Sequence, residues 1–431
     1  MDKTSNYLIY KHLIFILKNK IYRFNIIKLS IFMKNITLMI CLTCINIFAQ
    51  QINGIQLFNP DTNDETPIIS PDQQLILKFD DLSNSSTIYR YTIKHLDRNW
   101  QDDGLFFTEY AKGTPYGLVD NLQYSFNTLQ KYTHYELTFP NEKIYPIISG
   151  NFEIIIYKNS PEKPIIKKRF CIVENKNSIL INVSRFFDKN NPKINQRIEI
   201  QANAPSLSAN ISTISLSIIQ NNNWNNSLTN LKPSSVTGSN ILFQQPKLAF
   251  AGNNEFFFFD NKNINQSYDM IANTEILNEE NHTYLFPVWV NLSDYLYQPD
   301  VNGAFYFRRN DMGTERNADI EADYSWVHFT LPIQPIEKNI FVLGQFNDYT
   351  PSPEYQMYYN EKSKAYEAKI YLKQGFYNYL FALQDHDTID FNKINGNFWQ
   401  TKNLYQALLY YRPFGKNYDA ILSYGELRNT P

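Results

Sequence analysis

The sequence is short of the residues on which most enzyme sites depend. It has three cysteines, six histidines and 14 glycines among 431 residues. Phosphate and dinucleotide loops need closely spaced glycines, because only a bare backbone approaches phosphate, and no such spacing occurs. The Gly-x-Ser-x-Gly turn of many hydrolases is missing, and no two histidines stand at the spacing of zinc ligands. We therefore expect no catalytic residue, no cofactor and no metal.

The best candidate for a cation site is the acidic run 385–390, which contains Asp385, Asp387 and Asp390. Three carboxylates can hold calcium, but the run lacks the glycine and the terminal glutamate of the known calcium loop. An exposed turn is the favoured interpretation. Paired carboxylates for glycoside hydrolysis stay open as an alternative, because only folding brings such a pair together.

Two of the three cysteines, Cys41 and Cys44, lie in an apolar run near the N-terminus. If that run is removed, Cys171 is alone and forms no internal disulfide, so packed cores must supply the stability. Cys171 lies in an apparent strand. We interpret it as a small core residue and not as a nucleophile.

The apolar run 36–49 follows a short basic segment that begins at Met33. A basic start, an apolar stretch too short to span a membrane and a small residue at Ala49 are typical of a secretory signal peptide. We predict a signal peptide in residues 1–50, with translation starting at Met33, and a mature chain in the periplasm. The alternative is an uncleaved N-terminal anchor, lengthened by residues 8–17.

Charge argues against nucleic acid as a partner. The whole chain has a formal charge of −2 and residues 1–50 carry +6, so residues 51–431 carry about −8. Such a chain lacks the basic surface that binds phosphate backbones.

Aromatic residues, by contrast, are abundant, with 31 Phe and 31 Tyr. Together with β-branched residues they favour pleated strands, and many short runs alternate between apolar and polar positions. The clearest runs are 75–79, 89–95, 135–139, 152–157, 168–173, 179–183, 197–201, 214–218, 255–259, 304–308, 324–331, 339–344, 365–372, 375–383 and 406–412. The sequence therefore predicts an all-β protein of tandem immunoglobulin- or fibronectin-like β-sandwich domains.

Polar or proline-rich breaks divide these strands into three sets. We predict a first sandwich in residues 51–175, a second in 176–333 and a third in 334–431. The second boundary rests on Pro332 and Pro335, which cannot donate to a central ladder. The Asn-rich stretches 221–226 and 261–265 are expected to be turns or loops.

One predicted loop, residues 308–323, is unusually long and dense in charges of both signs. Hairpin loops usually have two to five residues, and longer loops are often functional or disordered. We select the loop as a candidate partner contact through Arg308, Arg309, Arg316, Asp319 and Glu321. The alternative is a solvated hairpin tip.

Three stretches together resemble the plug protein family of the type IX secretion system. They are 89–100 with 109–110 and 124–141, then 321–329, and finally 396–399 with 404–415. Alternating aromatics in the first stretch would face one sheet surface, and Trp100 would fill the space between the sheets.

The resemblance implies a periplasmic protein on the inner side of the outer membrane, which docks on a large β-barrel translocon and closes its channel without turnover. It implies no small-molecule substrate and no span through the membrane after signal cleavage. The family supplies no catalytic residue that we can assign to this chain.

The third predicted domain also resembles starch- and glycogen-binding modules, at 340–349 and 375–381. Such modules stack sugars on exposed aromatic rings, usually tryptophan. Tyr349 stands where a tryptophan often follows Asn-Asp. An envelope carbohydrate-binding protein is therefore the alternative function, and an enzyme would need a pocket with perturbed carboxylates.

Overall fold

The structure is a computed structural model that describes residues 52–61, 67–176, 179–186, 195–203, 211–245, 248–290 and 292–429. The predicted signal peptide and its start at Met33 lie outside these residues. The described part is almost entirely β, as predicted, and it forms one compact unit. Within it, no helix is long and apolar enough to span a membrane.

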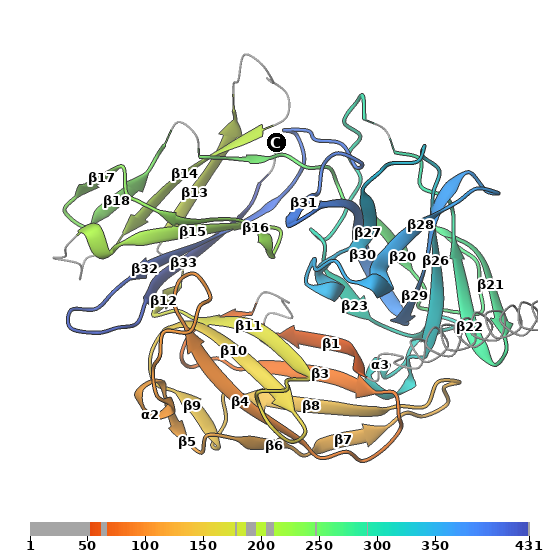
Figure 1. The fold of residues 1–431 in the computed structure, drawn as a ribbon, viewed down its shortest axis with the longest axis horizontal. Coiled ribbons are helices and arrows are strands. Elements are labelled where there is room, and N and C mark those ends of the chain that lie inside the picture. The colour runs from red at the N-terminus through yellow and green to blue at the C-terminus, as the bar shows by residue number, and fades with distance from the viewer. Residues whose placement is uncertain are drawn as a thin grey trace, which may run out of the picture. The chain divides into compact units, whose positions relative to one another are not determined.

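The first sandwich occupies residues 52–173, and most of its strands match the predicted runs (Figure 1). One sheet has the order β1 (Ile52–Phe58), β3 (Leu75–Asp81), β8 (Thr133–Phe139) and β7 (Asn121–Tyr124). The other has the order β2 (Ile68–Ile69), β11 (Ile166–Ile172), β10 (Gly150–Tyr157), β4 (Tyr89–Leu96) and β6 (Gly117–Val119). A one-turn helix, α2 (Phe107–Tyr110), precedes the small pair β5 (Ala111–Gly113) and β9 (Ile144–Pro146).

Aromatic rings fill this first core because alternate strand residues point inward. Phe79 stacks on Tyr135 with ring centroids 5.1 Å apart, and Tyr89 meets Phe79 edge to face at 5.2 Å. The buried Tyr89 hydroxyl donates to Asp81 at 2.8 Å, so its polar end is satisfied.

The second sandwich combines distant parts of the chain. One sheet has the order β12 (Asn175–Lys176), β33 (Ala420–Arg428), β32 (Leu404–Tyr411), β15 (Ser215–Gln220) and β16 (Asn223–Leu231). The facing sheet has the order β13 (Ile179–Arg185), β14 (Asn195–Asn203), β18 (Asn240–Phe243) and β17 (Ser235–Thr237), with β19 (Ala249–Ala251) also on β14. A 3-10 turn, η2 (Ile211–Thr213), precedes β15.

The third body is one ten-stranded sheet. Its main path is β20 (Phe257–Asp260), β30 (Gly375–Asp385), β27 (Asn339–Leu343), β28 (Gln356–Asn360), β29 (Ala365–Lys373), β26 (Tyr324–Leu331), β22 (Glu280–Leu285) and β21 (Ile271–Leu277). Strands β23 (Phe305–Phe307) and β31 (Thr388–Asp390) pair with β30 outside this path. Two 3-10 turns, η3 (Gln345–Asn347) and η4 (Pro353–Tyr355), connect β27 to β28.

The sheets do not follow the expected division at 333/334. Strand β26 lies before Pro332 and β29 lies after it, yet the two pair over eight residues. Conversely, β32 pairs with β15 from Ser215 to Gln220 (Figure 1). The third body is therefore inserted between β19 and β32 of the second sandwich. The prolines interrupt the ladder as predicted, but the chain then returns to the same sheet.

The Asn-rich stretch 221–226 differs partly from the expected turn. Only Asn221 and Asn222 form the turn, both with positive φ, as the type I′ turn of a two-residue hairpin loop requires. From Asn223 the chain continues as β16. The second Asn-rich stretch, 261–265, contains no strand, as expected.

Candidate docking surfaces

The predicted contact loop 308–323 is bound mainly to its own chain. It contains the short hairpin β24 (Asn310–Asp311) and β25 (Thr314–Glu315), followed by the one-turn helix α3 (Ala318–Glu321), whose first turn is capped by the Asn317 side chain. The backbone N–H of Phe126 donates to Ile320 O at 2.8 Å, which joins the loop to the first sandwich.

The five selected side chains do not form one surface. Arg308 pairs with Glu315 at 2.5 Å and with Asp260 at 3.4 Å. Arg309 donates to the backbone carbonyls of Asn127 at 3.1 Å and of Glu321 at 2.5 Å. It therefore binds the loop to the first sandwich and to its own C-terminal end.

The remaining selected residues divide between the interior and solvent. Asp319 is bound by Lys78 at 2.8 Å, and the carboxylate of Glu321 accepts from the Asn317 N–H at 3.4 Å. Arg316 has a side chain that is 47% exposed and pairs with Asp311 at 3.4 Å. Of the three selected arginines, Arg316 offers the most exposed side chain to a partner.

A buried ionic network lies beneath this loop. The Asp80 carboxylate accepts from Lys373 at 2.6 Å, from the Tyr324 hydroxyl at 2.7 Å and from His134 Nδ1 at 2.7 Å. Asp80 belongs to β3 and Lys373 to β29, so the network joins the first sandwich to the inserted body. Burial, followed by the Asp80 charge, raises the pKa of Tyr324, so its hydroxyl stays protonated and donates.

The same region contains the one group of three metal-type ligands that the described residues offer. It consists of His134, Glu136 and Asp319, whose ligand atoms lie within 4.8 Å of one another. The Lys78 ammonium, however, lies 2.8 Å from Asp319 and 3.6 Å from Glu136. Lys78 already supplies the positive charge that these carboxylates need. Although burial opposes it, the Lys78 hydrogen bond lowers the pKa of Asp319.

The acidic run 385–390 contains the last residue of β30, the two-residue turn 386–387 and the strand β31. His386 and Asp387 are exposed at its tip, and Asp385 pairs with Lys338 at 2.5 Å. This is the exposed turn that the sequence favoured.

A second long connection, which the sequence analysis did not select, exposes large apolar side chains. It runs from the end of β22 at Leu285 to the start of β23 at Phe305. Trp289 is 77% exposed and Leu296 is 76% exposed. The other large exposed apolar residues of this segment are Phe286, Leu292 and Tyr297. The sequence contained a sign of this exposed segment, because apolar residues recur in it without the period of a strand or of a helix. Exposed apolar side chains that adjoin form the kind of patch at which partners bind, so this segment is a candidate contact surface.

Two buried carboxyl groups fix this segment. The Tyr295 hydroxyl donates to Glu255 at 2.5 Å, and Asp300 accepts from the Phe256 N–H at 2.6 Å. Burial raises the pKa of Glu255 to about 7 and that of Asp300 to about 6. These are the perturbed carboxylates that an enzyme would need, but their hydrogen bonds anchor a loop, and neither lines the cavity described next.

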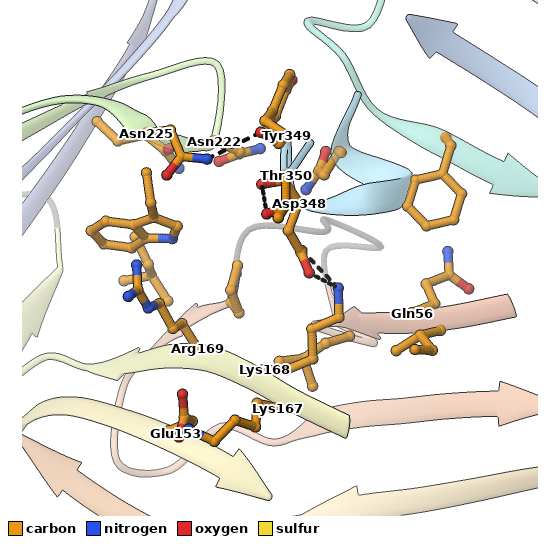
Figure 2. Close-up of a pocket in the computed structure, with 18 residues that line it drawn as sticks. Gln56, Glu153, Lys167, Lys168, Arg169, Asn222, Asn225, Asp348, Tyr349 and Thr350 are labelled. Carbon is orange, nitrogen blue, oxygen red and sulfur yellow. Dashed lines mark hydrogen bonds and ion pairs between the residues drawn. The ribbon is translucent and has the colours of Figure 1, made fainter. Parts of the chain in front are cut away.

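A cavity of about 270 Å³ lies where the three bodies meet (Figure 2). Strand β11 contributes Lys167, Lys168 and Arg169. The second sandwich contributes Trp224 and amide side chains, and the inserted body contributes residues 348–350. The cavity is therefore polar and has several cations on one side.

The prediction for Trp100 differs from the structure. Trp100 does not lie between the sheets of the first sandwich. It packs edge to face on Trp224 of the second sandwich, with ring centroids 4.7 Å apart. Its positive φ of 62° places it in a turn outside β4, which directs the ring away from the core. Tyr349, which stands where sugar-binding modules often have a tryptophan, is 1% exposed, and its hydroxyl donates to the Asn221 carbonyl at 3.1 Å.

Fold and surfaces together define an all-β protein of joined sandwiches. Residues 52–174 match the family model of the type 9 secretion system plug protein 1st domain. The chain thus carries the first domain of the type IX secretion plug family, as the sequence predicted. Among solved structures, a hypothetical protein from Parabacteroides merdae is similar, with a TM-score of 0.82 and 26% identity over 88% of this chain and 98% of that chain. A comparison with curated proteins gave no match.

Proposed function

We propose that this protein is a non-enzymatic plug, which docks from the periplasm on the outer-membrane β-barrel translocon of the type IX secretion system and occludes its channel. The observation that carries the proposal is the plug-family first domain at 52–174. It is joined to the inserted body by the buried pair Asp80–Lys373, and to the second sandwich by the buried Tyr410 hydroxyl, which donates to Asn151 at 2.8 Å. Occlusion needs bodies that stay joined, because a barrier must resist displacement.

The apolar segment 286–297 is the first candidate for the docking surface. Its exposed rings and aliphatic side chains give a partner area to bury, and burial contributes about 25 cal/mol per Å² of apolar surface. Aromatic anchors such as Trp289 often dominate interface energies. The exposed Arg316 remains the second candidate, where an acidic barrel surface would favour contact.

Co-purification from membranes tests the docking. The tagged wild-type protein should retain a very large barrel at low salt, and Trp289→Ser with Leu296→Ser should reduce the recovered barrel at least tenfold. Phe414→Ser is the matched control, because Phe414 is fully exposed on another loop. If the wild-type protein retains no barrel, the plug proposal fails. If the double variant retains it fully, the apolar segment is not the docking surface.

Occlusion is tested in cells. Deleting the gene should make the outer membrane leaky to large antibiotics and dyes while part of the cargo is still secreted, because an unplugged channel stays open. Arg316→Glu should produce a weaker leak than the deletion if this residue contacts the barrel. Unchanged permeability in the deletion strain would exclude a plug.

A further inference from the structure

Two histidines on neighbouring strands of the inserted body lie on one face of the sheet and contact each other. His282 belongs to β22 and His328 to β26, which run parallel and side by side (Figure 1). The direct partner of His328 in this ladder is Tyr284, two residues after His282, so all three side chains share the face. His282 Nδ1 lies 2.9 Å from His328 Nε2. The two histidines are 46 residues apart in the chain, which is why no short spacing motif indicates them.

Both rings are suited to bind a metal ion, because they are neutral at pH 7. Burial lowers the pKa of His282, and it lowers that of His328 to about 4. The neutral imidazole is the form that binds metals. One ring of the pair now donates its N–H to the other. When that proton moves to the second nitrogen of its own ring, each histidine offers a lone pair on the facing nitrogens, and no proton is lost.

The distance between the facing nitrogens favours one coordination geometry. Histidine nitrogens bind at about 2.0 Å from a metal ion, so two of them 2.9 Å apart subtend about 90° at the metal. This is the angle between neighbouring ligands in the square-planar sites of Cu²⁺ and Ni²⁺. The tetrahedral sites of zinc need nitrogens about 3.3 Å apart. The planes of the two rings differ by 26°, and a turn of each ring aims both lone pairs at one ion.

A carboxylate of the next strand lies beside the pair. Glu275 of β21 is the direct ladder partner of His282, so its side chain is on the same face, and it is exposed. The Tyr284 hydroxyl donates to Glu275, and this bond raises the pKa of Tyr284. The Tyr284 ring in turn stacks on His328 with centroids 4.1 Å apart. Negative charge outweighs positive charge around the two rings, since the charges acting on them are those of Glu275, Glu280, Glu367 and Lys369.

We propose that His282 and His328 bind one square-planar divalent transition metal ion, Cu²⁺ or Ni²⁺, with Glu275 as the third protein ligand and water as the fourth. Cu²⁺ binds more tightly, because the affinity of such ligands rises from Ni²⁺ to Cu²⁺. The ion joins β22 to β26. Since β22 ends at Leu285, the ion also fixes the strand from which the exposed apolar segment 286–297 departs. This binding goes beyond the proposed docking, because it needs no barrel.

The first test uses the purified mature protein without an affinity tag, freed of metal by chelation and then given one equivalent of Cu²⁺. Its electron paramagnetic resonance spectrum should show tetragonal Cu²⁺ bound by two imidazole nitrogens. This measurement needs no substitution, so it decides the matter even if a histidine variant is unstable. A spectrum of hydrated Cu²⁺, or of Cu²⁺ with a single imidazole nitrogen, would overturn the proposal.

The second test measures Cu²⁺ affinity by titration calorimetry. His282→Gln and His328→Gln should each weaken binding at least tenfold, and Glu275→Gln should weaken it several-fold while both nitrogens remain in the spectrum. His386→Gln is the matched control and should bind as the wild type does, because His386 is an exposed histidine on a turn and pairs with Asp385. Circular dichroism verifies that each variant is folded.

Three results of this titration would contradict the site. Wild-type affinity in both folded histidine variants, or loss of binding in His386→Gln, would show adventitious binding at the surface. Full displacement of Cu²⁺ by an equal concentration of Zn²⁺ would contradict the square-planar geometry. Recovery of the barrel in co-purification is independent of all these results, so the metal site and the plug proposal fail separately.

Discussion

Cys171 is protected by its position. Its side chain is fully buried, and its thiol donates to Asn151 Oδ1 at 3.4 Å. Burial raises the pKa of the thiol, so the reactive thiolate is scarce at neutral pH. We expect no labelling of the native mature protein by a thiol reagent at pH 8, and one equivalent after denaturation. Unfolding midpoints with and without reductant should agree, and Cys171→Ala should cost roughly 1 kcal/mol. Rapid labelling of the native protein would contradict this assignment.

Glu255 should make stability depend on pH. Its pKa is raised to about 7 in the folded protein, against a value near 4.5 when unfolded. Between pH 4.5 and about pH 7 the folded state therefore binds more protons than the unfolded state. The stabilisation that comes from protonated Glu255 is present at low pH and is lost as the pH rises through about 7. Glu255→Gln should keep the Tyr295 hydrogen bond and remove the dependence.

Urea unfolding at several pH values measures the difference in stability between Glu255→Gln and the wild type. From pH 5 to pH 8 the stability of the variant relative to the wild type should increase by roughly 2 kcal/mol, after allowance for solvent screening. Asp300 also titrates in this range, and its charge helps to raise the pKa of Glu255, so the difference reports Glu255 together with its coupling to Asp300. Glu142→Gln, at an exposed carboxyl, is the control and should follow the wild type. Parallel curves for Glu255→Gln and wild type would refute the role of this carboxyl.

At the scale of elements, we expect Lys373, at the end of β29, to make a main stabilising contact between the inserted body and the first sandwich. It is 1% exposed and lies 2.6 Å from Asp80. Removing one partner of a buried ion pair leaves the other charge uncompensated, at a cost of about 3–5 kcal/mol. Lys373→Met should therefore lower the free energy of unfolding by that amount in urea titrations. Lys369→Met, on the same strand but exposed, should cost under about 1 kcal/mol. Similar small losses for both would show that the pair contributes little.

Individual strands were largely predictable, because alternation of apolar and polar residues reports which positions face a core. The predicted run 365–372 is β29 within one residue, and 324–331 is β26 without change. Alternation does not report the partner strand. Nothing in 406–412 indicates that β32 pairs with β15 rather than with its sequence neighbours.

The candidate surfaces were less predictable than the strands. Loop length and charge selected 308–323, but Arg309 and Asp319 are used by contacts to residues far away in the sequence, Asn127 and Lys78. Charge in a sequence does not distinguish a side chain paired within the chain from one that is available to a partner.

At the scale of the whole molecule, the insertion makes a prediction about which fragment folds. The chain leaves and re-enters the second sandwich at adjacent points, since the Asn403 amide donates to Gly252 O at 2.8 Å. The core of the inserted body extends from Phe259 to Ile394, without residues of the other two bodies. A fragment of residues 253–402 should therefore fold alone, with a cooperative thermal transition and a native-like near-ultraviolet spectrum.

The fragment 334–431 is the matched comparison, because it follows the boundary that sequence breaks suggested. It separates β27–β30 from β26, with which β29 pairs over eight residues, and it keeps β32 without β15. Half of each core would be exposed to water, so we expect this fragment to be unfolded or aggregated. Circular dichroism and gel filtration of both fragments show whether each one folds. Cooperative folding of 334–431, with failure of 253–402, would mean that the chain divides at Pro332–Pro335 after all and that the long-range pairing of β32 is not required.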